Sequence, residues 1–93
     1  MARRSFNKSG ISKVPATKPI VYKLETAKGG PNYIGSAKKG RVRERLNEHL
    51  PGGPDPIPAK TVKVRQFSSI EAAKDAEKRA IKAKQPKYNI QHK

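Results

Sequence analysis

Hydrophobic and polar residues alternate with a period of two in three stretches of the chain. These stretches are residues 20–24 (IVYKL), 32–36 (NYIGS) and 61–67 (TVKVRQF). Such alternation is typical of β-strands that bury one face against a core. Residues 29–31 (GGP) lie between the first two stretches and favour a tight turn. The pattern therefore predicts an antiparallel hairpin and, further along the chain, a third strand.

Hydrophobic residues recur at helical spacing in two other stretches. Residues 41–50 place apolar side chains on one side and charged side chains on the other, and residues 70–84 carry a row of alanines. The element order over residues 20–93 is β-β-α-β-α. This order predicts an α/β fold of the α+β kind, with a small three-stranded antiparallel sheet and flanking helices.

Residues 1–19 show neither the alternation of a strand nor the spacing of a helix, and they mix Arg, Lys, Ser and Pro. We therefore predict a flexible basic N-terminal arm over this segment. The arm either becomes ordered on a phosphate backbone or trails as an inert tail. Residues 20–93 form the expected globular domain, and its core must be thin because only 33% of the chain is hydrophobic.

The charge of the chain restricts its partners. Twenty-two Lys and Arg against seven Asp and Glu give a formal net charge of +15, which is usually tolerated when the partner is a polyanion. A membrane is disfavoured, because no apolar run could span a bilayer and no basic stretch has a strongly apolar opposite side. The absence of cysteine excludes disulfides and thiolate metal sites.

One acidic residue interrupts the apolar side of the second predicted helix. Glu77 lies four residues after Ala73 and four before Ile81, both on that side. A carboxylate that faces a core is unfavourable unless it is paired or binds a cation. Two interpretations remain open. Glu77 is either an acid at the border of the apolar side or a ligand for Mg²⁺, which often takes one or two carboxylates.

Four polar side chains and one glycine are further candidates for a functional site. Arg45 and His49 lie one turn apart on the first predicted helix, where they suit phosphate binding and proton transfer, although a solvated basic side is the alternative. Tyr22 and Tyr33 lie on the paired strands and would ordinarily pack their rings. Gly35 lies inside a strand, a position that often marks the close approach of a backbone or a ligand.

Taken together, these residues resemble the motifs of the GIY-YIG endonuclease domain family. The resemblance runs from Ile20 to about Ile90, and the first motif has Ile20 and Val21 in place of the family's glycine and isoleucine. In chain order, the matching segments are residues 20–22 (IVY), 33–35 (YIG) and 45–49 (RLNEH), Glu77 with Ile81, and residues 88–90 (YNI).

The resemblance implies a metal-dependent endonuclease that hydrolyses DNA phosphodiester bonds with one Mg²⁺ or Mn²⁺ ion. Glu77 would hold the ion. Tyr22 would help to activate the attacking water, directly or through a relay, and Tyr33 would orient the water or the phosphate. Arg45 would neutralise charge on the phosphoryl oxygens. His49 would share the role of base or position Tyr22.

The resemblance also implies two residues that organise the site. Gly35 would let its strand lie against a helix or the substrate, and Asn89 would hold the site together by hydrogen bonds. Basic residues near these motifs are expected to contact the DNA backbone. They are Lys38, Lys39, Arg41, Arg43, Lys63 and Arg65.

The position of the catalytic arginine has an alternative. The interval that follows Tyr33 is slightly longer than in common members of the family, so Arg43 is a possible substitute for Arg45. Arg45 is preferred because it keeps the one-turn spacing to His49.

No sequence-reading module is recognisable in the chain. We therefore expect a monomer that recognises DNA structure, cuts with little selectivity, or relies on a protein partner for specificity. The expected location is the cytoplasm, with association to the nucleoid when DNA is bound. A non-catalytic nucleic-acid-binding module on the same fold is the alternative, and the charge alone also suits a ribosome-associated protein.

Overall fold

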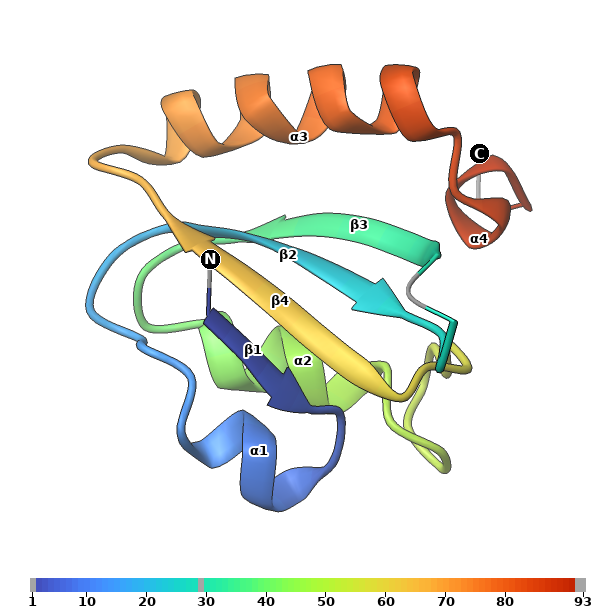
Figure 1. Cartoon of the computed structure of the whole chain (residues 1–93). Helices are drawn as coiled ribbons and strands as arrows, with labels where there is room; N and C mark the ends of the chain where they lie inside the picture. The colour runs from blue at the N-terminus through green and yellow to red at the C-terminus, as the bar shows by residue number, and fades with distance from the viewer. Residues whose placement is uncertain (1, 29, 92–93) are drawn as a thin grey trace.

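A computed structural model describes residues 2–28 and 30–91 of the chain (Figure 1). Four strands form one antiparallel sheet with the order β1-β4-β2-β3. The strands are β1 (Ala2–Ser5), β2 (Ile20–Glu25), β3 (Pro31–Ala37) and β4 (Thr61–Gln66). The helices are α1 (Lys8–Ser12), α2 (Val42–Glu48), α3 (Ile70–Lys84) and α4 (Lys87–Gln91). Figure 1 shows α3 over one face of the sheet and α1 and α2 against the other.

The predicted α+β class and its three strands are present, but the sheet has a fourth strand. β1 pairs with β4, so that Ala2 lies opposite Val64 and Ser5 lies opposite Thr61. The predicted three-stranded sheet with the order β-β-α-β-α is therefore wrong, and the observed order is β-α-β-β-α-β-α-α. A strand as short as β1 has too few positions to show alternation. Gly29, in the predicted turn, lies outside the described residues.

Residues 2–19, which we expected to form a flexible arm, instead contribute to the folded domain. Phe6, Ile11 and Val14 are all buried. Asn7 caps α1, since its side-chain oxygen accepts a hydrogen bond of 2.7 Å from a backbone N–H of that helix. The buried side chains attach the segment to the same core as the rest of the chain, so residues 2–19 are not a separate arm.

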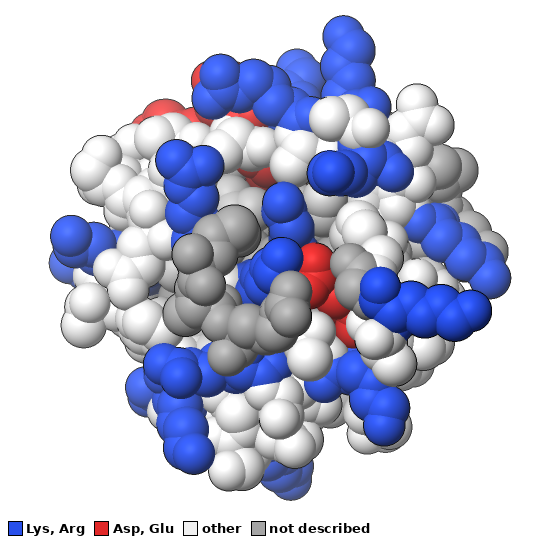
Figure 2. Space-filling view, viewed as in Figure 1, with Lys and Arg blue, Asp and Glu red and all other residues white. Residues whose placement is uncertain are grey.

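Basic side chains far outnumber acidic ones on the face of the molecule that Figure 2 shows. In the space-filling view, Lys and Arg are distributed over the whole of the viewed face, whereas Asp and Glu are few (Figure 2). This distribution follows from the net charge of +15. A surface of this kind attracts polyanions from several directions, so the geometry of the individual residues must define any specific site.

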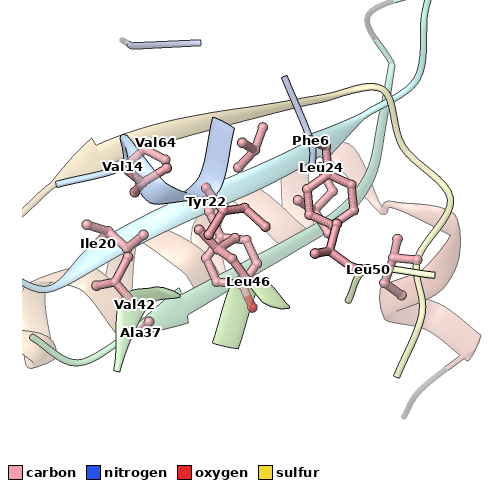
Figure 3. Close-up of a cluster of buried hydrophobic side chains, with 13 residues drawn as sticks. Phe6, Val14, Ile20, Tyr22, Leu24, Ala37, Val42, Leu46, Leu50 and Val64 are labelled. Atoms are coloured by element: carbon pink, nitrogen blue, oxygen red, sulfur yellow. The ribbon is translucent and has the colours of Figure 1, made fainter. Parts of the chain in front are cut away.

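The larger core lies between the sheet and the helices α1 and α2. Ile20, Tyr22 and Leu24 of β2 point into it and are fully buried. Figure 3 shows Tyr22 among aliphatic side chains of this core, with Leu46 of α2 close by. A smaller core under α3 is built from Val21, Ile34 and Ala73. Because side chains alternate along β2, its only tyrosine faces α2 rather than α3.

The end of α3 returns the chain to the edge of the sheet. Ser69 begins the helix as its N-cap, with a side chain that accepts a hydrogen bond from the N–H of Ala72 at 3.1 Å. The helix ends at Gln85, which has a left-handed φ of 45°, and Pro86 follows. α4 consequently lies beside the edge strand β3 (Figure 1). Among the described residues, no helix is both long enough and apolar enough to cross a membrane.

Candidate active site

Tyr22 and His49 meet inside the larger core. The hydroxyl oxygen of Tyr22 lies 3.0 Å from Nε2 of His49, and the two residues are 0% and 1% exposed. Tyr22 comes from the middle of β2, and His49 directly follows α2. On its other side, Nδ1 of His49 lies 2.9 Å from the backbone oxygen of Asp55, in the proline-rich loop after α2. The imidazole is therefore held at both nitrogens.

The Asp55 carbonyl determines where the protons of this network lie. It can only accept, so Nδ1 of His49 carries a proton and donates it. A neutral imidazole has only one N–H, so Nε2 is unprotonated and accepts a hydrogen bond from the Tyr22 hydroxyl. The positive charge of the Arg45 guanidinium lies close enough to lower the pKa of Tyr22, which couples Arg45 electrostatically to this network.

Burial keeps the rings of this network uncharged. Burial raises the pKa of the Tyr22 phenol far above its usual value, and Tyr33 raises it further, while Arg45 opposes the shift. Burial also raises the pKa of Tyr33, where Arg45 opposes the shift and Glu77 adds to it. Burial lowers the pKa of His49. At neutral pH both phenols are protonated and the imidazole is neutral.

The lowered pKa of His49 predicts a loss of stability in mild acid. The unfolded chain takes up a proton at an ordinary histidine pKa of ~6.5, which the folded protein resists. The stabilisation is therefore complete above that pH and is lost as the pH falls through the lower folded pKa. We expect a steeper fall in the free energy of unfolding between about pH 7.5 and 5 for the parent than for His49→Gln. Urea titrations across this range measure it, and equal slopes for the two proteins would contradict the account.

Tyr33 and Gly35 complete the aromatic cluster. The Tyr33 ring lies 4.7 Å from the His49 ring and 6.2 Å from the Tyr22 ring, measured between centroids. Gly35 lies opposite Tyr22 in the pairing of β2 with β3. A Cβ at Gly35 would lie 2.5 Å from the Tyr22 hydroxyl oxygen and 3.0 Å from Cε2 of Tyr33. Gly35 therefore leaves the space that the two phenols occupy.

Arg45 rather than Arg43 adjoins the phenols. Nη1 of Arg45 donates to Oε1 of Glu48 at 3.0 Å, and the Arg45 side chain is 39% exposed. Its guanidinium therefore acts electrostatically on the Tyr22 phenol and is still open to solvent. Nη2 of Arg43 instead donates to the backbone oxygen of Val14 at 3.2 Å, near α1. The geometry favours Arg45 as the arginine of the site.

Glu77 lies at the edge of the sheet, within electrostatic range of the phenols. The Ser36 hydroxyl donates a hydrogen bond of 2.7 Å to Oε1 of Glu77, which ties α3 to β3. Ser36 directly follows Gly35, against which the phenols pack. The carboxylate raises the pKa of both Tyr22 and Tyr33. Glu77 is partly exposed, as expected for an acid at the border of the apolar side of its helix.

The surroundings of Glu77 fit a magnesium ion with one protein ligand. Among the described residues, none makes a hydrogen bond or ion pair to its second carboxylate oxygen. The same part of the chain contains no group of three or more His, Cys, Asp or Glu side chains that could hold a metal. Mg²⁺ keeps several waters and takes one or two carboxylates together with substrate phosphate. A single exposed carboxylate is therefore sufficient for Mg²⁺, whereas structural zinc needs four ligands.

Asn89 joins α4 to the edge strand. The N–H of Ile34 donates to Oδ1 of Asn89 at 2.7 Å, and Nδ2 of Asn89 donates to the Ile34 carbonyl at 2.9 Å. Both bonds are buried. Ile34 lies between Tyr33 and Gly35, so this amide fixes the strand that carries the second tyrosine. These contacts agree with the structural role expected for Asn89.

Replacing Asn89 by alanine should lower the stability of the domain by about 2 kcal/mol, because it leaves a buried backbone N–H and C=O without their partner. Asn32 provides a matched control, since its side chain donates to the Pro58 carbonyl at 2.7 Å in an exposed position. Asn32→Ala should change the free energy of unfolding by less than about 1 kcal/mol. Equal losses for the two variants in urea titrations would contradict the structural role of Asn89.

The predicted DNA-binding residues divide into two groups. Lys38 and Arg41 belong to the first group, which lies beside the candidate active site. They line a pocket together with Arg45. Lys39 is exposed in the turn after β3. Lys38 and Arg41 are therefore neighbours of Arg45 in one pocket, whereas Lys39 does not line it.

The second group lies away from the phenols. Arg43 contacts the α1 side of the molecule. Lys63 of β4 lies 3.6 Å from the carboxylate of the buried Glu25, and the guanidinium of Arg65 lies 5.1 Å from the centre of the Phe67 ring. The structure does not bring these three basic residues together with Arg45.

Sequence reasoning missed four residues that take part in the site. They are Ser36, Glu48, Asp55 and Lys74, which lines the pocket with Arg45. Glu48 follows Arg45 by three residues, a helical spacing that could have indicated the pair. The contacts of the other three depend on how the chain folds back on itself, and no local spacing reveals them.

Comparisons with known proteins yield no family model that matches the chain and no significant match among curated proteins. The case for a function therefore depends on the residues and their geometry.

Proposed function

We propose that this protein is a metal-dependent endonuclease that hydrolyses phosphodiester bonds in DNA. The observation that carries the proposal is the convergence on one segment of β3, at the edge of the sheet. An exposed guanidinium, two phenols with a neutral histidine, and a carboxylate all adjoin that segment. The resemblance of the sequence to the GIY-YIG family supports the same reaction by analogy.

Arg45 would bind the phosphate and stabilise the charge that develops on it. Its donors suit phosphoryl oxygens, and its partial exposure leaves them accessible. Glu48 holds the guanidinium in place before the substrate arrives. Such preorganisation avoids the loss of side-chain freedom on binding.

Tyr22 and His49 would accept the proton of the attacking water. The raised pKa of Tyr22 excludes a phenolate at neutral pH, so its hydroxyl takes a proton only as it passes its own to Nε2 of His49. Tyr22 is fully buried in the free protein, and water reaches it only if the site opens when substrate binds. Tyr33 is partly exposed and would orient the water first.

Glu77 would hold one Mg²⁺ or Mn²⁺ ion, which when bound polarises the scissile phosphate and stabilises the leaving oxygen. Ser36 fixes the carboxylate at the sheet edge by the hydrogen bond to Oε1. Gly35 and Asn89 would keep β3 in the position that these groups need. We infer no preference for a DNA sequence.

A non-catalytic nucleic-acid-binding module is the second candidate function. The full burial of Tyr22 favours it, because a phenol without solvent contact does not exchange protons with water in that state. The net charge of +15 suits binding in either case. This candidate predicts strongly salt-dependent binding without any cleavage.

Nicking of supercoiled plasmid DNA tests the proposal and separates the two candidates. We expect nicked circles with Mg²⁺ or Mn²⁺ and none with excess chelator. An Arg45→Ala protein purified in parallel is the control for contamination. Equal nicking by that control would identify a foreign nuclease and contradict the proposal, whereas binding without nicking in either metal would support the second candidate.

A further inference from the structure

A basic pocket lies beside the candidate active site. It has a volume of about 230 Å³ and is formed by the end of β3 and by the beginnings of α2 and α3. Its basic lining residues are Lys38, Arg41, Arg45 and Lys74. Apart from Arg45, none of them has a part in the reaction proposed above.

The lining of this pocket is suited to an anion. None of the described residues that line it is acidic. Arg41 and Arg45 do have acidic partners, Glu44 at 2.7 Å and Glu48 at 3.0 Å, but both acids lie outside the lining. Like charges from three separate elements repel one another, and an anion between them relieves that repulsion. The pocket is therefore a concave site with one sign of charge.

Two residues that line the pocket also belong to the candidate active site. Arg45 lines the pocket, and its positive charge also acts on the Tyr22 phenol. Ser36 lines the pocket and also holds the carboxylate of Glu77. A strand of nucleic acid that places one phosphate at Arg45 and Glu77 therefore brings a neighbouring phosphate to the pocket.

We propose that this pocket binds a second backbone phosphate of the same DNA strand, adjacent to the phosphate that reacts. The inference rests on the proposed function and adds to it a binding subsite. Lys74 of α3 is the residue whose replacement distinguishes this subsite from a generally basic surface. The helical pattern places Lys74 on the polar side of α3 with Lys82, but only Lys74 lines the pocket.

DNA binding without catalysis tests the subsite. Affinity for a short duplex is measured by fluorescence anisotropy in EDTA, over a range of salt concentrations, for the parent, Lys74→Gln and Lys82→Gln. Both variants lose one charge from the same helix, and Lys82 is exposed two turns beyond the pocket. For Lys74→Gln we expect several-fold weaker binding and a slope of log K against log salt reduced by roughly 0.9. For Lys82→Gln we expect little change in either quantity.

Two outcomes overturn the subsite. Equal effects of the two variants would mean that Lys74 acts only as part of the diffuse positive charge. In a second experiment, thermal unfolding of the parent and of Lys74→Gln is measured with inorganic phosphate added. If Lys74→Gln weakened stabilisation by phosphate but left DNA binding unchanged, the pocket would be a site for free phosphate and not for a strand.

DNA binding tests the subsite, and plasmid nicking tests the enzymatic activity, so either proposal can be contradicted without the other. If the two variants bind DNA unequally and the parent does not nick plasmid, the subsite is supported and the proposed hydrolytic activity is contradicted. If the parent nicks plasmid and the two variants bind DNA equally, the hydrolytic activity is supported and the subsite is contradicted.

Discussion

Arg45→Ala should slow the cleavage of DNA by roughly 10²–10³-fold, the usual effect of removing one donor that stabilises developing charge. Arg45 is a partly exposed cation that opposes the raised pKa of Tyr22, so its loss also removes a positive charge from beside the buried network. Cleavage rates of a labelled duplex at saturating protein separate this effect from weaker binding.

Arg43→Ala is the matched control for that measurement. Arg43 lies on the same helix and carries the same charge, but it donates to the Val14 carbonyl on the α1 side. We expect its cleavage rate to stay within a few-fold of the parent. A large loss for Arg43→Ala with little effect of Arg45→Ala would show that the roles of the two arginines have been exchanged.

Gly35→Ala should damage both the fold and the site. The added Cβ would lie 2.5 Å from the Tyr22 hydroxyl oxygen and 2.6 Å from its Cζ, in a ring that is fully buried. Because Tyr22 cannot move without disturbing its hydrogen bond to His49, we expect about 1–3 kcal/mol of destabilisation. DNA cleavage should be lost even where the variant stays folded.

Gly30→Ala controls for the general effect of replacing a glycine. Among the described residues outside its chain neighbours, a Cβ there would have only the Thr26 hydroxyl oxygen within 4 Å, at 3.9 Å. Its free energy of unfolding should therefore stay within about 0.5 kcal/mol of the parent. If Gly35→Ala were as stable and as active as Gly30→Ala, the close packing of the phenols against β3 would be wrong.

The sequence indicated the elements that have a clear period. Alternation placed Ile20, Tyr22 and Leu24 on one side of a strand, and the structure buries all three in one core. The spacing of Arg45 and His49 indicated a common side of one helix turn. Both residues do approach Tyr22, although His49 lies one residue beyond α2.

The first strand and helix could not be predicted in the same way. β1 and α1 have four and five residues, which is too short for either period to be visible. Their order depends on tertiary contacts, above all on pairing with β4 and on burial of Phe6, Ile11 and Val14. The basic composition of the segment suggested a flexible arm, because no periodic pattern marked these three apolar residues as part of a core.

Periodicity also left the environment of Glu77 open. The helical pattern placed Glu77 within the apolar side of α3, where a carboxylate is unfavourable. In the structure the side chain lies at the edge of the sheet and accepts a hydrogen bond from Ser36. That partner is 41 residues away in the chain, so no local pattern connects the two residues. The same reason explains why no local pattern connected Lys74 with the pocket at Arg45.

The cleavage rate of Glu77→Gln under single-turnover conditions tests the central claim most directly. The amide introduced by this substitution keeps an oxygen that can accept from Ser36 but loses the charge that, in our proposal, holds the ion. Asp75→Asn is the control, because it removes the same charge from an exposed position on the same helix. We predict a loss of roughly 10³-fold or more for Glu77→Gln with DNA affinity retained, and little change for Asp75→Asn. Cleavage by Glu77→Gln at the rate of the parent would contradict the account.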